Sequence, residues 1–257
     1  MVITLAPVLF MIYGSFKTNV SLALIPPDLS LKSTTLENWQ KVLTGKGLKA
    51  FMNSLLITVI TTFLCIAFTS MAGYAFARKD FLGKKVAFTS LMATLMIPSQ
   101  ILMVPCFILM VKLGLYDSKL AVILSGAAPA SGVFLMKQAM STLPMEIFES
   151  AEMDGCSEFG QYFRMALPLA KSSIAALSIF TFVGAWNNFI WQLILLTSDE
   201  HITITLFLRS MVRGQDNLPI YGYQFAGAAF ASVPIIIAFL MFSKHFVSGI
   251  TVGAVKG

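Results

Sequence analysis

The sequence predicts an all-α, polytopic membrane protein in which residues 1–257 form a single domain with six transmembrane helices. Two features of composition lead to this class. Hydrophobic residues make up 57% of the chain and charged residues only 12%, whereas soluble proteins carry roughly 25% charged residues. The third observation is distribution: the apolar residues gather in runs that approach or reach the about 20 residues needed to cross a bilayer core.

The first apolar run, residues 1–16, lacks a basic start and a small-residue cleavage site, so it does not resemble a signal peptide. At 1.5 Å per residue it spans about 24 Å, short of the roughly 30 Å core. We therefore expect a first transmembrane helix that is short or truncated. An extracytoplasmic loop, residues 17–49, follows and contains a short amphipathic helix near Thr35–Leu43.

The second span is expected at Phe51–Ala77, where a cluster of small residues around Gly73 would let a neighbouring helix approach closely. The third span, Val86–Val111, is interrupted by Pro98 and Pro105. Helix breaks at membrane depth need protein or a wet cavity around the freed carbonyls. We expect this segment to pack inside the bundle or to line the pathway.

The remaining spans are expected at Leu120–Leu135, Ile174–Leu196 and Phe225–Phe242. An extracytoplasmic loop, residues 197–223, joins the last two spans, and a tail, residues 243–257, ends the chain. The net charge of +6 lies in short connections between spans, which favours lipid headgroups or charged partner surfaces as neighbours and not nucleic acid. Basic residues are balanced between the two sides, so charge alone does not orient the chain.

The sequence offers no catalytic or metal-binding constellation. Cys65, Cys106 and Cys156 are far apart, and the two histidines, His201 and His245, lie in different segments. Small buried hydrophobes are the favoured interpretation of the cysteines. An intramembrane enzyme is excluded because no nucleophile, base and metal-ligand grouping can be assembled.

The stretch 143–168 is predicted to form two short helices joined at Gly155. Ser141 or Thr142 can cap the first helix, and Pro144 suits an early helical position. Gly155 can adopt the positive φ that ends a helix.

The second helix of this stretch is predicted to begin after the cap Ser157 and to end at Pro168, whose ring clashes with the preceding turn. The apolar residues of this helix recur at helical spacing and predict one apolar stripe. They are Phe159, Tyr162, Phe163 and Ala166.

The spacing of this stretch resembles the EAA loop of bacterial ABC importer permeases. Glu149-Ser150-Ala151 is followed by three residues, Gly155, nine residues, and then Met165-Ala166-Leu167-Pro168; Ser150 and Met165 depart conservatively from the family pattern. The resemblance implies a cytoplasmic coupling loop that sits in a cleft of an ATP-hydrolysing subunit. The residues it assigns to ATPase coupling are Glu149, Ser150, Ala151, Asp154, Gly155, Phe159, Leu167 and Pro168.

The end of the chain, residues 246–257, resembles the tail of the maltose-type, MalG-like carbohydrate permeases, as do residues 185–189 and, more diffusely, 70–78. The resemblance implies that the loop 197–223 meets an extracytoplasmic solute-binding protein and that the tail reaches between two ATPase subunits. The tail residues concerned are Gly253, Ala254, Val255, Lys256 and Gly257.

The same resemblance implies a second, non-identical permease subunit and two ATP-binding subunits that hold ATP and Mg. It also implies a bacterial cytoplasmic (inner) membrane location with several passes through the lipid bilayer and cytoplasmic termini. The residues agree with an external energy source, because no ionisable residue falls centrally in a predicted span and no phosphate-binding loop is present. We therefore expect no cofactor and no metal on this chain.

A candidate substrate path lies in the fifth span, where amides and tryptophans could bind sugar hydroxyls and ring faces. Thr181, Asn188 and Gln192 would share one helix face, with Trp186 and Asn187 nearby. The alternative is that these amides bond across a helix interface. Weaker candidates are Asn53, Ser99 and Gln100.

The function predicted is a permease subunit of a binding-protein-dependent ABC importer that forms half of a carbohydrate path. The alternative from another class is a passive channel or secondary carrier that needs no ATPase. Within the importer class, the ligand could be an oligosaccharide, a monosaccharide, glycerol 3-phosphate or another small polyol derivative.

Overall fold

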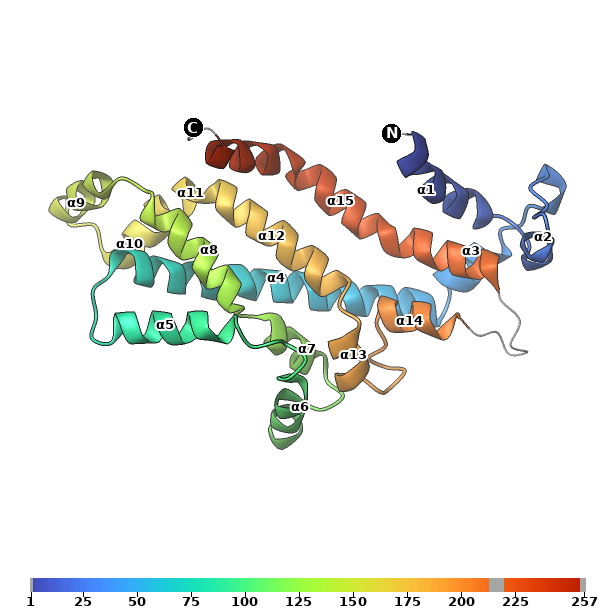
Figure 1. The fold of residues 1–257 in the computed structure, drawn as a ribbon, viewed down its shortest axis with the longest axis horizontal. Helices are drawn as coiled ribbons and strands as arrows, with labels where there is room; N and C mark the ends of the chain where they lie inside the picture. The colour runs from blue at the N-terminus through green and yellow to red at the C-terminus, as the bar shows by residue number, and fades with distance from the viewer. Residues whose placement is uncertain (1, 213–219, 255–257) are drawn as a thin grey trace. The chain divides into compact units, whose positions relative to one another are not determined.

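The computed structural model describes residues 2–212 and 220–254 of the chain, with side chains described for 5–212 and 220–241 (Figure 1). The described residues form helices and turns, which confirms the all-α prediction. The helices of the first half are α1 (Val2–Gly14), α2 (Asn19–Ala23), η1 (Leu31–Ser33), α3 (Glu37–Leu43), α4 (Lys46–Arg78), α5 (Lys84–Thr94), α6 (Met103–Lys112) and α7 (Lys119–Gly126). Those of the second half are α8 (Ala130–Ser141), α9 (Met145–Met153), α10 (Glu158–Gln161), η2 (Tyr162–Ala166), α11 (Leu167–Leu169), α12 (Lys171–Trp186), α13 (Ile190–Leu195), α14 (Ile204–Ser210) and α15 (Tyr221–Ala254).

The described residues fall into two compact units. The first unit is drawn from residues 1–56, 117–119 and 186–237, and the second from residues 57–116, 120–185 and 238–257. Each unit has its own apolar cluster. The first cluster includes Val42, Ala50, Trp186, Ile204, Phe207, Met211 and Ala226, and the second includes Cys65, Tyr74, Met136, Met140, Phe148, Tyr162 and Ala166.

Two described helices are long and apolar enough to cross a membrane, Lys46–Arg78 and Tyr221–Met241. The number rises to four if each of two bent helix pairs is one span: α7 with α8, bent by 42°, and Glu158–Leu169 with α12, bent by 77°. Leu5–Gly14 and Met103–Lys112 are shorter apolar helices. The structure therefore supports a membrane protein with several candidate spans, and the count of six stays a prediction.

The predicted second span lies within α4, which extends it at the N-terminal end. A close helix crossing occurs at Gly73, as its small neighbours indicated. A Cβ built on Gly73 would lie 2.6 Å from the Met136 Cβ and 2.8 Å from the backbone nitrogen of Lys137. The backbone of α8 thus approaches α4 more closely than any side chain at position 73 would permit.

The predicted third span is two helices, α5 and α6, separated by turns. Pro98 lies in these turns, whereas Pro105 lies in the first turn of α6 and does not break it. The missing N–H of a proline costs nothing at this position, because the first N–H groups of a helix have no helical partner. No residue of α5 is buried and only Met110 of α6 is buried, so the expectation that this segment packs inside the bundle is wrong within this chain. Its role in lining the pathway stays a prediction.

The predicted fifth span is not one helix. α12 ends at Trp186 and α13 begins at Ile190. The Asn188 side chain accepts a hydrogen bond from the backbone N–H of Trp191 at 3.2 Å. Asparagine competes with helical hydrogen bonding in this way and favours helix starts. The pair Asn187-Asn188 thus interrupts a run that is otherwise apolar enough to continue.

Three other predicted elements correspond to helices of the structure. α3 confirms the helix expected near Thr35–Leu43, and the Thr35 hydroxyl accepts from the Glu37 N–H at 3.1 Å. The predicted fourth span corresponds to α7 and α8, a bent pair that is one candidate span, with Pro129 as the residue that precedes α8. The sixth span lies inside α15, and the backbone of this helix continues to Ala254.

Candidate functional site

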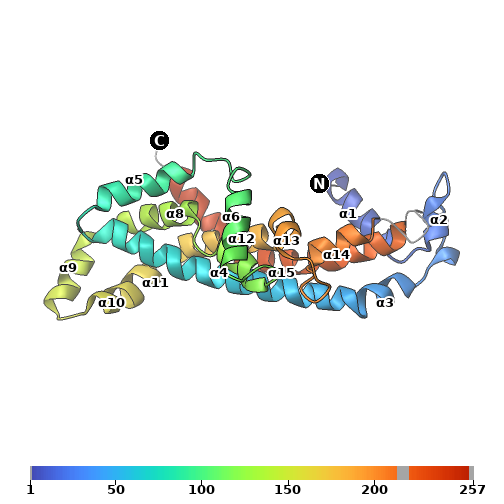
Figure 2. The same cartoon turned by 90° about the horizontal axis from the view of Figure 1, so that it is seen from below.

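The segment Leu143–Leu169, called here the 143–169 segment, folds as helix, glycine turn and helix, as predicted. Gly155 has a φ of 76°, and Ser157 caps α10 by accepting a hydrogen bond from the Gly160 N–H at 3.2 Å. A left-handed conformation costs a residue with a Cβ roughly 1–2 kcal/mol, so glycine determines this turn. Figures 1 and 2 both show α9 and α10 beside the C-terminal end of α4.

The cap predicted for the first helix is wrong. The Ser141 and Thr142 hydroxyls donate to the carbonyls of Lys137 at 2.7 Å and Ala139 at 2.9 Å. Both residues therefore belong to the end of α8, where side-chain hydroxyls bond backwards along a helix. Pro144 precedes the first residue of α9 directly, at the cap position.

The second helix of the segment contains a wide turn that was not predicted. In η2, a π turn, the Leu167 N–H donates to the carbonyl of Tyr162, five residues earlier. Pro168 lies within α11, and the helix ends one residue later at Leu169, so the expected stop at Pro168 is slightly early. A proline ring clashes with the carbonyl four residues before it in a regular helix, and a π turn moves this carbonyl away.

The wide turn also overturns the predicted apolar stripe. Tyr162 and Ala166 are buried, with exposures of 5% and 0%, whereas Phe159 and Phe163 are 68% and 58% exposed. The extra residue in the π turn rotates the preceding residues of α10 about the helix axis. The buried residues of the segment are instead Phe148, Ala151, Gln161, Tyr162 and Ala166.

Most residues assigned to ATPase coupling lie on the outside of the segment. Ala151 is buried and Leu167 is half-buried, while the other six are exposed: Glu149, Ser150, Asp154, Gly155, Phe159 and Pro168. Met153 is 89% exposed beside them. The outer face therefore combines exposed Met and Phe side chains, types enriched in the cores of protein interfaces, with carboxylates, which suit the polar rim of such an interface.

Sequence reasoning missed the residues that hold this segment in place. The Arg78 guanidinium lies 4.5 Å from the centre of the Phe148 ring, and Lys79 forms an ion pair with Glu158 at 2.7 Å. The hydrogen bond from Lys79 to the Glu158 carboxylate raises the pKa of Lys79. The sequence feature that could have pointed to these contacts is the resemblance over residues 70–78, which implied no role for these residues.

The predicted substrate-path residues do not share one helix face, because α12 ends among them. Thr181 belongs to the second unit, and its hydroxyl lies 3.4 Å from the Cys65 sulfur. Trp186 belongs to the first unit, where it is 2% exposed and donates its indole N–H to the carbonyl of Ala231 at 3.0 Å.

Of the remaining path residues, Asn187 is exposed, Asn188 accepts a hydrogen bond from the Trp191 N–H, and Gln192 is buried at 1% exposure. The Gln192 amide oxygen accepts from the hydroxyls of Thr203 at 2.5 Å and Thr205 at 2.6 Å. These contacts are the kind that the alternative of bonding between helices predicts. A role in the substrate path stays a prediction for all five residues.

A second polar cluster fixes the connection that follows α13. Asp117, at a φ of 54°, accepts hydrogen bonds from the N–H groups of Thr197 at 2.8 Å and Ser198 at 3.1 Å. Its carboxylate lies 3.6 Å from His201 Nδ1. Partial burial raises the pKa of Asp117, but the hydrogen bonds from Thr197 and Ser198 outweigh it and lower the pKa below its usual value.

α4 contributes to the same connection. Asn53 donates its amide to the carbonyls of Glu200 and Ile202, both at 2.9 Å. This internal pairing gives Asn53 a structural task, while Ser99 and Gln100, the other weak path candidates, lie in the exposed turns between α5 and α6.

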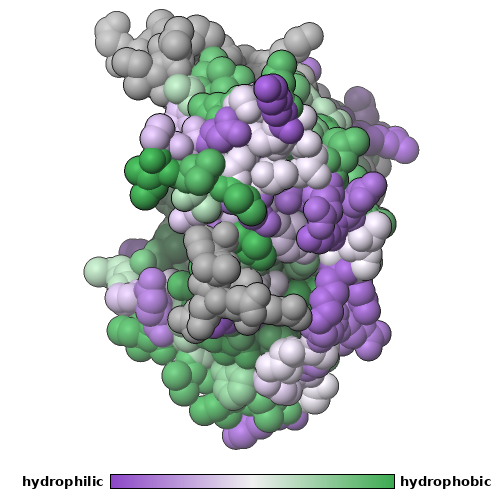
Figure 3. Space-filling view, turned by 90° about the vertical axis from the view of Figure 1, so that its right-hand side faces the viewer, coloured by the Kyte–Doolittle hydropathy of each residue, from purple (hydrophilic) through white to green (hydrophobic). Residues whose placement is uncertain are grey.

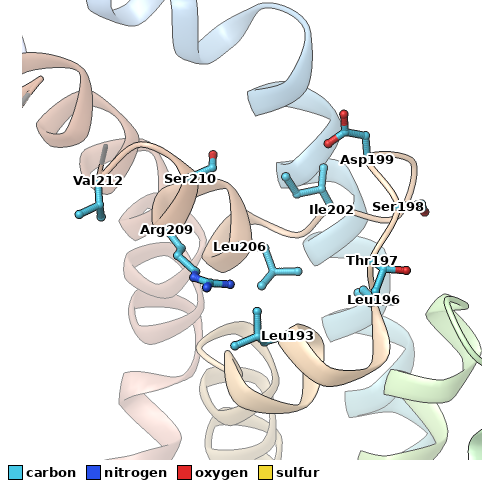
Figure 4. A pocket seen from close by; sticks show the side chains of 10 residues that line it. All are labelled: Leu193, Leu196, Thr197, Ser198, Asp199, Ile202, Leu206, Arg209, Ser210 and Val212. Atoms are coloured by element: carbon cyan, nitrogen blue, oxygen red, sulfur yellow. The ribbon is translucent and has the colours of Figure 1, made fainter. Parts of the chain in front are cut away.

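A cavity of about 770 Å³ opens beside this connection (Figure 4). In Figure 4, Arg209 of α14 points toward Leu193 and Leu206, while Asp199 lies on the connection. The cavity is lined by Leu193, Leu196, Thr197, Ser198, Asp199, Ile202, Leu206, Arg209, Ser210 and Val212.

Figure 3 shows one face of the molecule, on which hydrophilic patches lie beside hydrophobic ones.

Two predictions, the loop 197–223 and the tail 243–257, fall partly outside what the structure describes, because residues 213–219 and 255–257 are outside the described residues. Val255, Lys256 and Gly257 lie outside the described residues, and Gly253 and Ala254 are described only as backbone of α15.

Among the described residues, no group of three or more His, Cys, Asp or Glu side chains could hold a metal ion.

The helices of membrane-spanning length indicate an integral membrane protein. The family model for the binding-protein-dependent transport system inner membrane component matches residues 66–252, and the chain belongs to this family. This membership confirms the predicted assignment to the permease subunits of ABC importers.

The chain is 38% identical over 257 residues to the arabinooligosaccharides transport system permease protein AraQ of Bacillus subtilis, covering 98% of this chain and 91% of the relative. It is 30% identical to the lactose transport system permease protein LacG of Rhizobium radiobacter, covering 99% and 92%. A crystal structure of a bacterial ABC transporter that imports the acidic polysaccharide alginate contains a similar fold. The TM-score is 0.86 at 20% identity, covering 95% of this chain and 91% of that one.

Proposed function

We propose that this chain forms half of the translocation path of a binding-protein-dependent ABC importer for a carbohydrate. The observation that carries the proposal is the similarity of nearly the whole chain to permeases named for arabinooligosaccharides and lactose. Both names favour an oligosaccharide over a monosaccharide, glycerol 3-phosphate or another small polyol derivative. Family membership likewise favours an importer over a passive channel or a secondary carrier.

In this proposal the 143–169 segment is the cytoplasmic surface that docks on an ATP-binding subunit. Its exposed residues support the idea: Glu149 and Asp154 supply charge, and Met153 and Phe159 supply apolar area at the centre of such a contact. Closure of two ATP-binding subunits on ATP and Mg would then move the segment and reorient the path. The chain itself hydrolyses nothing.

The remaining partners follow from the same proposal. A second, non-identical permease subunit completes the path, and an extracytoplasmic solute-binding protein docks near the cavity beside residues 193–212. This arrangement places the termini and the 143–169 segment on the cytoplasmic side of the inner membrane. The tail, residues 243–257, would contact the ATP-binding subunits.

The proposal is tested by Gly155→Asp, with Gly114→Asp as a matched control. Both glycines have a positive φ, 76° and 70°, and a Cβ at either position meets nothing within 4 Å. Both changes therefore carry a similar conformational cost, roughly 1–2 kcal/mol, but only the first alters the proposed docking surface. We expect Gly155→Asp to lower uptake of arabinooligosaccharides or lactose at least about tenfold, with normal membrane insertion.

The wild-type chain should also bring down an ATP-binding protein on purification. Normal uptake by the Gly155→Asp variant would refute the coupling role of the segment. Transport by the purified chain without any nucleotide-hydrolysing partner would refute the importer assignment itself.

A further inference from the structure

The C-terminal end of α4 touches the 143–169 segment along one helix face. Ser70, Tyr74 and Arg78 follow one another at intervals of four residues and therefore share this face. The Ser70 hydroxyl and the Tyr162 hydroxyl are hydrogen-bonded at 2.7 Å in a buried position. The Tyr74 ring contacts both Phe148 of α9 and Tyr162 of the π turn, at centroid distances of 6.3 and 5.4 Å.

Arg78 completes the contact at the start of the segment. Its guanidinium lies over the Phe148 ring at 4.5 Å, donates to the carbonyl of Leu143, and lies 3.2 Å from the Met145 sulfur. The next residue, Lys79, pairs with Glu158 of α10. One helix end thus holds the connection before α9, α9 itself, α10 and the π turn.

These contacts matter because both covalent connections of the segment are bends. Residues 142–144 are not helical between α8 and α9, and the axis turns by 77° between Leu169 and Lys171. A bend can absorb the movement of a helix that is attached only through it. Side-chain contacts that bypass the bends transmit movement because packed side chains resist deformation.

α4 is suited to receive such movement. It runs without a break from Lys46 to Arg78, and at Gly73 it packs against the backbone of α8, the helix that leads into the segment. The contacts from Ser70 to Lys79 therefore join the segment to an uninterrupted helix of membrane-spanning length.

We propose that Ser70, Tyr74, Arg78 and Lys79 form a clamp through which the 143–169 segment and α4 move as one body, with Arg78 and Tyr74 as the main positioning residues. The proposal rests on the proposed function, because it names the part of the chain to which the docked segment delivers its movement. It assigns a role to residues 70–78, for which the resemblance to other permeases implied no role.

The clamp is tested in the full chain, assembled with its permease and ATP-binding partners, by Arg78→Met and Arg78→Lys. Methionine keeps an unbranched apolar stem, shorter than that of arginine, but loses the cation and the hydrogen bond to Leu143. Lysine keeps the charge and loses the planar stack on Phe148. The control is Lys85→Met, which removes an exposed cation at the start of α5. Spin labels at Met71 and Met153, 46% and 89% exposed, report the separation of α4 and α9.

In the wild type and in Lys85→Met, the label separation should be the same without nucleotide and with trapped ATP. In Arg78→Met it should change between the two states, and the ratio of transported arabinooligosaccharide to hydrolysed ATP should fall about fivefold or more. Arg78→Lys should lie between the two. A mere loss of stability would lower transport and hydrolysis together and leave their ratio unchanged.

A nucleotide-independent separation and a wild-type ratio in Arg78→Met would overturn the clamp while leaving the proposed function intact. Failure of the wild-type chain to bring down an ATP-binding protein would instead overturn the proposed function. If Arg78→Met does not fold, the combined change Ser70→Ala and Tyr162→Phe removes only two hydroxyl groups. It should lower the same ratio, and an unchanged ratio would again overturn the clamp.

Discussion

The 143–169 segment and the region 188–205 use their polar residues in opposite ways. In the segment, Glu149, Ser150 and Asp154 are exposed, and aromatic residues fill the interior. In the region 188–205, Gln192 and Thr203 are buried, with exposures of 1% and 0%, and bond to each other. The first arrangement leaves polar groups available to a partner, whereas the second uses them to fix the chain itself.

The difference shows that a polar residue in an apolar sequence has two possible meanings. Most buried polar groups in proteins are hydrogen-bonded. The amides at positions 188 and 192 look like a sugar path in the sequence, yet each has a partner in the same chain. The carboxylates of the segment are exposed. Glu158 pairs with Lys79, and the others face outward.

The largest expected effect is on the free energy of unfolding, and it compares a glycine of the second unit, Gly73, with one of the first, Gly227. Gly73→Ala should destabilise the chain by about 3 kcal/mol, because its Cβ would meet the backbone of Met136 and Lys137. Gly227→Ala should cost less than about 1 kcal/mol, because its Cβ would meet only the flexible ends of Met211 and Leu208 and alanine favours the helix. Denaturant unfolding of the purified chain in detergent measures both, and equal losses would contradict the contrast.

A smaller effect is expected for Gln192→Leu, which leaves the buried Thr203 hydroxyl without its acceptor at 2.5 Å. The loss of unfolding free energy should be about 2 kcal/mol. The control Gln138→Leu, at an exposed position of α8, should change it by less than about 0.5 kcal/mol. If Gln192→Leu kept its stability and raised the KM for uptake instead, the amide would belong to the substrate path after all.

The smallest effect concerns Asp117 and its dependence on pH. Hydrogen bonds from Thr197 and Ser198 hold its folded-state pKa below the ordinary 3.8. The stabilisation is therefore present above about pH 4 and is lost as pH falls through the lowered pKa. Asp117→Asn should cost about 1 kcal/mol at neutral pH, and its difference from the wild type should shrink in acid.

The measurement for Asp117 is the free energy of unfolding as a function of pH for the wild type and the variant. Asp80→Asn, at an exposed position in the turn after α4, provides the control. A difference between wild type and Asp117→Asn that did not change with pH would show that the carboxylate charge is not what fixes the 197–198 connection.

Local signals in the sequence predicted local structure well. Gly155, Ser157 and the helix near Thr35–Leu43 were predicted because a positive φ, a cap and an amphipathic repeat depend on neighbouring residues. The small residues around Gly73 likewise predicted a close crossing, which occurs with α8. Family membership, reached from the spacing of the 143–168 motif, is confirmed over residues 66–252.

The sequence could not predict features that depend on distant partners. At the break before α13, the Asn188 side chain accepts the hydrogen bond of the Trp191 N–H, which would bond to a backbone carbonyl in a continuous helix. The burial of Tyr162 beside an exposed Phe163 depends on Ser70 and Tyr74, about 90 positions earlier in the chain. Periodicity treats these aromatic residues as equivalent, whereas the packing of α4 distinguishes them.

The π turn at Tyr162–Ala166 has a consequence for how related chains can vary in length. One residue of a regular helix corresponds to a rotation of about 100°. Deleting one residue within the turn would convert it to an ordinary helix and would rotate Glu158 and Phe159 to another side of the helix. The interval of nine residues after Gly155 therefore fixes the rotation of α10 about its axis. An insertion or deletion there would change the direction in which the side chains of α10 point.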